Sequence, residues 1–138
     1  MVLADTGYWL ALANRRDRWH EAAVGVTRGL DEQLVTTWPV MTETCHLLLA
    51  RLGSTSERRF LEQVEANVDV YEIGVGRVPE IRALMVKSED LPMDLADASL
   101  VLAADELGTA RILSTDVRDF RAYRWRGREP VDNLLTEH

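Results

Sequence analysis

The sequence of 138 residues contains one cysteine, Cys45, and one lysine, Lys87. A single cysteine excludes an internal disulfide and suits a reducing compartment, and no Cys/His pattern indicates a zinc site. The apolar runs are far shorter than the ~20 residues that span a membrane. The N-terminus also lacks the basic and apolar regions of a signal peptide. We therefore expect a cytoplasmic protein that does not associate with a membrane.

Several common catalytic motifs are also absent. The sequence contains no P-loop, no GxGxxG fingerprint and no serine nucleophile elbow. The three histidines, His20, His46 and His138, have no metal-ligand spacing. A phosphatase of the haloacid dehalogenase type would carry a second aspartate two residues after Asp5, where Gly7 stands. These absences leave the acidic residues as the candidates for chemistry.

The net charge of −7 argues against non-specific binding of nucleic acid by a broad basic surface. It does not exclude a nucleic-acid substrate, because acids gathered around one cation create a local field that differs from the overall charge. Five arginines lie close together near the C-terminal end and fit either a solvated surface or contacts with phosphate groups. They are Arg118, Arg121, Arg124, Arg126 and Arg128.

Short apolar or β-branched runs alternate with amphipathic segments along the chain. The predicted strands are residues 2–5, 33–37, 68–73 and 110–114, with a last edge strand at 129–131. The predicted helices are residues 8–14, 19–28, 39–51, 54–67, 78–87, 94–107 and 117–120. Such alternation is typical of a parallel sheet covered by helices on both faces. We expect a single domain over residues 1–138 with a three-layer α/β/α fold and a central parallel sheet of four to five strands.

Two predicted strands end in an aspartate. The apolar opening 1–4 leads to Asp5, and the run 111–115 leads to Asp116. Ligands of open parallel sheets bind beyond the carboxyl ends of the strands, so both carboxylates belong at one edge. Each of them fits either a helix N-cap or a metal ligand, and Thr6 places a hydroxyl beside the first.

Further acids lie on predicted helices. Glu43 is either a solvated residue at the margin of an apolar stripe or a carboxylate that completes an oxygen cage. Asp94 and Asp97 form an Asp-x-x-Asp motif at a helix start, where Asp94 suits the N-cap and Asp97 the third helical position. Asp119 repeats this spacing after Asp116 and fits either a capping acid or a ligand. Taken together, these acids predict a site for Mg²⁺ or Mn²⁺, which favour oxygen ligands and serve phosphodiester hydrolysis.

Four segments of the sequence form a recognisable set. They are Leu3-Ala4-Asp5-Thr6-Gly7, Thr42-Glu43-Thr44, Met93-Asp94-Leu95-Ala96-Asp97-Ala98-Ser99-Leu100 and Ser114-Thr115-Asp116-Val117-Arg118-Asp119-Phe120. Together they resemble a PIN domain and, more narrowly, the VapC toxins of bacterial toxin–antitoxin pairs. The similarity spans nearly the whole chain and keeps the order and rough spacing of the motifs.

The resemblance implies a small ribonuclease that binds Mg²⁺ or Mn²⁺ and cleaves RNA with metal-activated water, leaving a 5′-phosphate and a 3′-hydroxyl. It also implies a homodimer and a cognate antitoxin that blocks the site. By position it matches Thr6 and Thr115 to hydroxyls that support metal-bound water, and it leaves open whether Asp116 or Asp119 is the fourth acid. The residues it assigns to the acidic quartet are Asp5, Glu43, Asp97 and Asp116, with Asp94 and Asp119 as auxiliary candidates.

A non-catalytic binding module of the same fold is the alternative interpretation. Such a module would show no metal-dependent activity and would tolerate Asp5→Asn and Asp97→Asn, because no chemistry would depend on these carboxylates. Fold alone does not decide between the two, since unrelated functions occur on one fold.

Overall fold

The computed structural model describes residues 1–125 and 129–135, without the side chains of 118, 121, 122, 124, 125, 129 and 130. Its centre is a parallel sheet of five strands in the order β3-β2-β1-β4-β7. This confirms the predicted fold class. The five strands are β1 (Val2–Ala4), β2 (Leu34–Thr37), β3 (Val68–Tyr71), β4 (Arg111–Leu113) and β7 (Asp132–Asn133).

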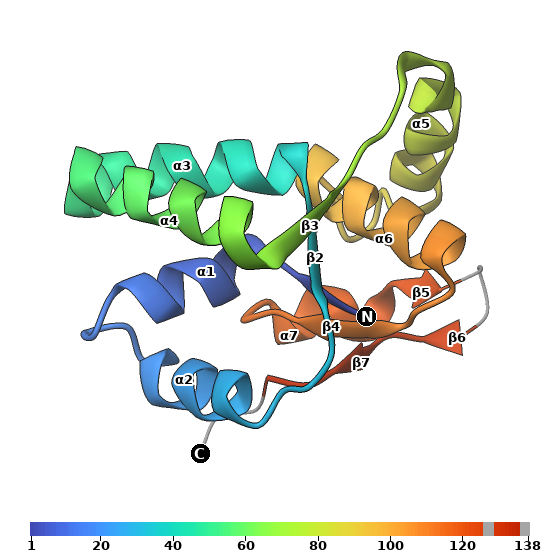
Figure 1. The fold of residues 1–138 in the computed structure, drawn as a ribbon. Helices are drawn as coiled ribbons and strands as arrows, with labels where there is room; N and C mark the ends of the chain where they lie inside the picture. The colour runs from blue at the N-terminus through green and yellow to red at the C-terminus, as the bar shows by residue number, and fades with distance from the viewer. Residues whose placement is uncertain (126–128, 136–138) are drawn as a thin grey trace.

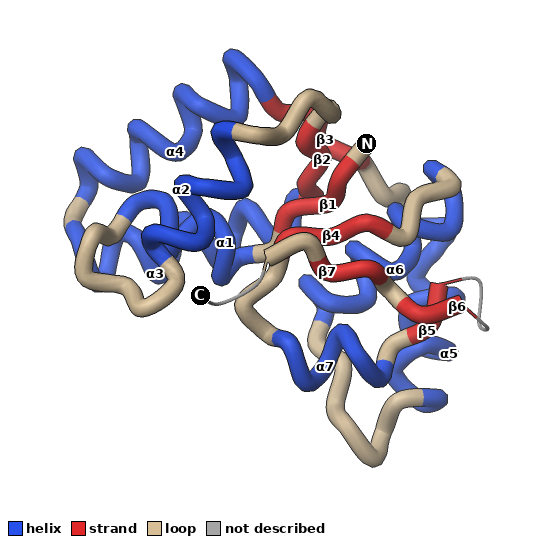
Figure 2. The backbone as a smooth tube through the Cα atoms, turned by 90° about the horizontal axis from the view of Figure 1, so that it is seen from below, coloured by secondary structure: helices blue, strands red, loops and turns tan. Residues whose placement is uncertain are grey.

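The helices cover both faces of this sheet. They are α1 (Thr6–Ala13), α2 (His20–Arg28), α3 (Trp38–Leu52), α4 (Ser54–Asn67), α5 (Val78–Lys87), α6 (Leu95–Leu107) and α7 (Val117–Ala122), with a 3₁₀ turn η1 (Val75–Arg77). Figure 2 shows α1, α2 and α4 on one side of the strands and α5 and α6 on the other. In Figure 1, α3 and α4 run side by side as a helical hairpin. No described helix is long and apolar enough to cross a membrane.

Local sequence explains the central elements. The three residues of β1 are at most 1% exposed, as expected for a middle strand buried on both faces. Helix α6 is buried continuously from Ala96 to Ala104, and its many alanines allow close approach to the sheet. It ends at Gly108, which adopts a left-handed conformation with φ 70°. The sheet and α6 therefore form the rigid centre of the fold.

The prediction of a last edge strand at residues 129–131 was wrong. Residues Glu129–Pro130 form β6, which pairs with β5 (Arg124–Trp125) in a separate antiparallel ribbon. Pro130 has no N–H for a ladder hydrogen bond, so pairing with β4 starts beyond it. Asp132 N donates to Ala110 O at 2.7 Å, and Leu134 N donates to Ile112 O at 2.8 Å. The edge strand of the main sheet is consequently β7.

The side chains of the predicted arginine cluster lie outside what the structure describes. Arg126 and Arg128 have no described position, and Arg118, Arg121 and Arg124 have a described backbone only.

The first turn of α1 lies very close to the segment that follows β4. A methyl group built on Gly7 would stand 1.8 Å from Thr115 Oγ1 and 3.0 Å from Thr115 Cβ. Real Cβ atoms do not approach other atoms so closely, and the short β-branched side chain of Thr115 has few alternative rotamers. A glycine at position 7 therefore lets α1 start directly against the end of β4.

We predict that Gly7→Ala destabilises the protein by about 1–3 kcal/mol, because the added methyl group overpacks this contact. The measurement is urea denaturation followed by circular dichroism. Gly7→Ala combined with Thr115→Ala should recover part of the loss, since the second change removes the clashing hydroxyl. Gly25→Ala is the control, because a methyl group there meets no atom within 4 Å. A Gly7→Ala variant as stable as Gly25→Ala would contradict the prediction.

Candidate metal centre at the strand ends

Strands β1 and β4 are parallel neighbours, so their carboxyl ends lie at the same edge of the sheet. The strand order changes direction between them, because β1 leads to β2 on one side and to β4 on the other. Open α/β sheets bind ligands at such a switch point. Asp5 N donates to Leu113 O at 3.0 Å and ties the two ends together. Asp5 and Asp116 therefore enter the same region from two different strands.

Asp5 is held by both of its carboxylate oxygens. Oδ1 accepts a hydrogen bond from Thr6 N at 2.8 Å, which caps α1. Oδ2 accepts from the hydroxyl of Ser114 at 2.9 Å, and the same hydroxyl accepts from Asp116 N at 2.9 Å. Ser114 thus fixes the first acid against the backbone of the second. The helix-cap interpretation of Asp5 is correct, and it is compatible with a place in a site.

The other aspartates also sit at helix starts. Asp94 caps α6 by accepting from Asp97 N at 2.8 Å, and Asp97 Oδ2 accepts from Asp94 N at 3.4 Å in return. Asp116 caps α7 by accepting from Asp119 N at 3.2 Å. The phenol of Tyr123 donates to Asp97 Oδ2 at 3.2 Å. These bonds fix each carboxylate relative to the backbone of its helix.

All eight predicted site residues line one cavity of about 300 Å³. Glu43 reaches it from α3, so four separate stretches of chain supply acids to the same space. The predicted residues in its lining are Asp5, Thr6, Glu43, Asp94, Asp97, Thr115, Asp116 and Asp119.

The carboxylates raise one another's proton affinity. Burial, opposed by its hydrogen bonds to Thr6 N and Ser114, raises the pKa of Asp5 to about 6, with smaller contributions from Glu43 and Asp116. Burial and then the charges of Asp94 and Asp5 raise the pKa of Asp97 to about 8. Both carboxyl groups therefore keep their protons to a higher pH than a free aspartate does, because burial disfavours the charged form.

The remaining acids follow the same pattern. Burial and then a side-chain hydrogen bond with Asp119 raise the pKa of Asp116 to about 6, although the hydrogen bond from Asp119 N acts in the opposite direction. Burial and then the charge of Asp94 raise the pKa of Glu43. Among the described side chains, the recorded ion pairs join none of these acids to a lysine or arginine.

The residues present fit a hard divalent cation by their chemistry. All ionisable donors of the cavity are carboxylates, the ligands that Mg²⁺ and Mn²⁺ prefer. Within the described residues the buried Thr6 hydroxyl has no hydrogen-bond partner at 3.5 Å or less, and Glu43 is the near group that it favours in the charged form, which lowers the pKa of Glu43. Among the described residues, no group of three or more His, Cys, Asp or Glu side chains is close enough together to hold a metal ion.

The PIN domain family model matches residues 2–126. The chain belongs to the PIN domain family. It is 26% identical to ribonuclease VapC26 of Mycobacterium tuberculosis over 124 residues, which cover 89% of this chain and 92% of that protein. It also resembles the crystal structure of M. tuberculosis VapC20, described as a sarcin–ricin loop cleaving toxin. The TM-score is 0.79 at 19% identity, over 86% of this chain and 92% of that chain.

Three residues that support the site in this PIN domain were not predicted as site residues, although Gly7 and Ser114 stand in the motifs that carry the resemblance. Ser114 bonds Asp5, Tyr123 bonds Asp97, and Gly7 admits the close contact with Thr115. Ser114 stands directly before the Thr-Asp pair, so its position was a usable signal. Tyr123 had none, because its contact with α6 depends on the packing of α7.

We predict that the metal-free protein loses stability as the pH rises from about 4 to about 8. Asp97 has a folded pKa of about 8 against an ordinary value of 3.8, so within this window the folded state binds more protons than the unfolded state. The stabilisation from protonated Asp97 is fully present below pH 3.8, its ordinary pKa, and is lost as the pH rises to its folded pKa of about 8. Urea denaturation in EDTA at several pH values measures this slope.

Asp97→Asn should flatten the slope, because the amide does not titrate. Asp69→Asn is the matched control, since Asp69 is an exposed aspartate on β3. A slope that is equal in the parent and in Asp97→Asn would show that Asp97 does not titrate in this window.

Proposed function

We propose that this PIN domain is a metal-dependent endoribonuclease that acts in the cytoplasm as the toxin of a toxin–antitoxin pair. The observation that carries the proposal is the convergence of eight predicted residues on one cavity at the switch point of the sheet. The carboxylates there have raised pKa values, so a cation would relieve an existing electrostatic cost. The ribonuclease name of the relative VapC26 supports RNA as the substrate.

The proposed ligands of Mg²⁺ or Mn²⁺ are Asp5, Glu43, Asp97 and Asp116. Such an ion, when bound, supplies an activated water and neutralises charge on the scissile phosphate. Ser114 and Tyr123 orient two of the acids by hydrogen bonds, which limits their movement when an ion is absent. Thr6 and Thr115 present hydroxyls to the same space, and Asp94 and Asp119 add negative charge at its rim.

The proposal predicts that the purified protein, free of antitoxin, cleaves RNA with Mg²⁺ or Mn²⁺ and not with EDTA. Total RNA and a sarcin–ricin loop oligonucleotide are suitable substrates, the second because the structural neighbour VapC20 is described as cleaving that loop. Asp97→Asn should reduce the cleavage rate by at least about 100-fold, as loss of a group that stabilises transition-state charge does. Gel analysis with 5′-end chemistry identifies the products.

Asp69→Asn is the matched control, because it removes an exposed aspartate far from the cavity on β3. Cleavage that persists in EDTA, or an Asp97→Asn variant as active as the parent, would rule the proposal out. Tolerance of both Asp5→Asn and Asp97→Asn with no activity in the parent would favour the non-catalytic binding module.

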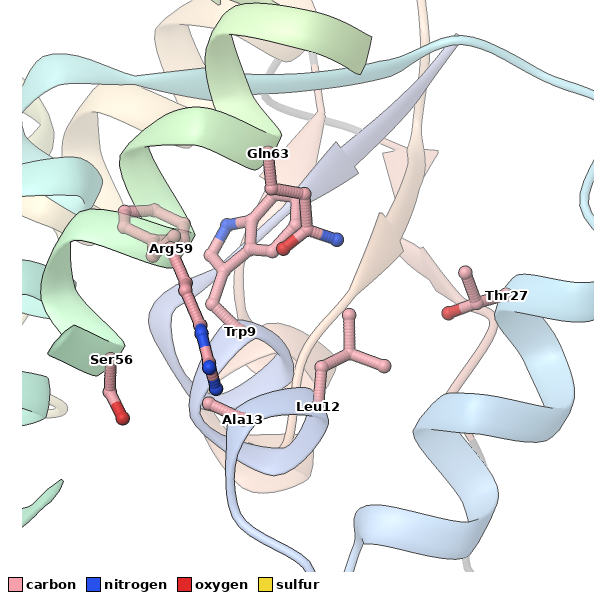
Figure 3. Close-up of a pocket in the computed structure, with 8 residues that line it drawn as sticks. Trp9, Leu12, Ala13, Thr27, Ser56, Arg59 and Gln63 are labelled. Carbon is pink, nitrogen blue, oxygen red and sulfur yellow. The ribbon is translucent and has the colours of Figure 1, made fainter.

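A groove on the opposite side of α1 supports the antitoxin part of the proposal. It has a volume of about 380 Å³ and lies between α1, α2 and α4. Figure 3 shows Trp9 and Leu12 from α1 facing Arg59 and Gln63 from α4. Trp9 Nε1 is buried and has no hydrogen-bond partner among the described residues. The groove therefore combines apolar surface with the polar side chains of Arg59 and Gln63.

We propose that a segment of the antitoxin occupies this groove and that a basic arm of the same protein reaches the acidic cavity. Helix α1 makes both contacts possible, since Thr6 lines the cavity while Trp9 lines the groove. A basic arm would be attracted to the carboxylates and to a chain of net charge −7. We also propose a homodimer, for which the exposed Val75, Val78 and Val86 of η1 and α5 provide apolar surface.

Arg59→Glu should weaken inhibition by a co-expressed antitoxin about tenfold or more, because it reverses a charge that lines the groove. The measurement is RNA cleavage titrated with the antitoxin. Arg58→Glu is the control, since Arg58 is an exposed neighbour on the same helix and does not line the groove. Equal inhibition of the two variants would place the antitoxin elsewhere.

A further inference from the structure

A second cavity adjoins the acidic one and is apolar over most of its lining. It has a volume of about 630 Å³ and shares Glu43 and Asp94 with the acidic cavity. The rest of its lining comes from the starts of α3 and α6 and includes Trp38, Pro39 and Leu95. The two cavities are therefore neighbouring compartments, one acidic and one apolar.

Trp38 is unusually exposed for its size. Its side chain is 53% exposed, and the neighbouring Leu95 is 50% exposed. Large apolar side chains that lie together on a surface mark interaction sites more often than single ones do. Trp9, by contrast, is 1% exposed and belongs to the core. The indole of Trp38 is thus free to contact a ligand.

The backbone that carries Trp38 is fixed relative to the acids. The preceding residue, Thr37, is fully buried and caps α3, with Thr37 Oγ1 accepting from Val40 N at 3.4 Å. The Thr37 hydroxyl also shares a hydrogen bond of 2.6 Å with the hydroxyl of Ser99. Ser99 belongs to α6, the helix that carries Asp97. The position of Trp38 is consequently tied to the acidic cavity through one short hydrogen bond.

The described lining of the acidic cavity offers RNA no lysine or arginine side chain. The chain has a net charge of −7, and the described walls of the acidic cavity repel phosphate. An aromatic ring binds a nucleobase by stacking, which needs no charge and accepts every base. A base can stack on a side chain only when it has left its own helical stack, so an unpaired nucleotide is required.

We propose that Trp38, with Pro39 and Leu95, forms a stacking platform for an unpaired nucleobase next to the scissile phosphate. The apolar compartment receives the base while the acidic compartment receives the phosphate. The substrate class is accordingly single-stranded RNA or the loop of a hairpin, and a continuous duplex is excluded. This inference rests on the proposed ribonuclease function and adds the residue that positions its substrate.

The test uses the full chain with a labelled single-stranded RNA of five nucleotides. Binding is measured by fluorescence anisotropy in EDTA, and cleavage is measured in Mg²⁺. Trp38→Ala should weaken binding and raise KM by between about fivefold and about 150-fold, the range for loss of one stacked base. Its kcat should stay within about twofold of the parent value, because the side chain binds and does not react.

Two further variants keep the result specific. Trp38→Phe should restore most of the affinity, since a phenyl ring also stacks on a base. Leu49→Ala should bind like the parent, because Leu49 lies on the same helix, is 49% exposed and lines neither cavity. Thermal melting checks that all three variants are folded.

The possible outcomes separate this inference from the proposed function. A parent protein that binds the oligonucleotide through Trp38 but cleaves nothing overturns the ribonuclease and supports the platform. Cleavage with an unchanged KM in Trp38→Ala overturns the platform and supports the ribonuclease. Equal binding of a continuous duplex also overturns the platform. Sedimentation that shows Trp38→Ala as a monomer and the parent as a dimer assigns the surface to a second copy, and likewise overturns it.

Discussion

Burial of several carboxylates close to one another is the constraint on which the rest of this structure depends. Asp5 and Asp97 are 7% and 8% exposed, and each raises the pKa of its neighbours or has its own raised by them. Loss of water makes every such charge costly, and a second like charge nearby adds to the cost. The fold must therefore hold these groups in place against a force that drives them apart. A cation in the same cavity would turn this cost into binding energy.

Helix starts provide the restraint. Asp5, Asp94 and Asp116 are the N-caps of α1, α6 and α7, so each of them accepts a hydrogen bond from a backbone N–H of its own helix. An N-cap bond needs one lone pair of a carboxylate, which leaves others available to a ligand. The sequence left open whether these aspartates cap helices or belong to a site, and in the structure they do both, since they also line the cavity. The N-cap hydrogen bond fixes the position of each carboxylate in that cavity.

The sequence predicted the fold class, the strand ends and eight of the residues that line the acidic cavity, because these follow from local patterns and from a resemblance spread over the chain. It did not predict the contacts that depend on register and packing. Ser114 bonds an acid 109 positions away, and Tyr123 meets Asp97 only because the end of α7 lies against the start of α6. The final edge strand was misplaced by a few residues, since the effect of Pro130 on pairing depends on which neighbour the strand meets.

The cost of the acidic cavity is itself an argument for function. The fold places Asp97, whose pKa is raised, within the buried run of α6 from Ala96 to Ala104. A group that lowers stability persists in a protein when activity needs it, and strained or repulsive groups gather at functional sites for this reason. Structural caps alone would be served by asparagine or serine, which carry no charge. The negative charge of these acids, which capping by asparagine or serine would not bring, therefore supports the proposed metal site.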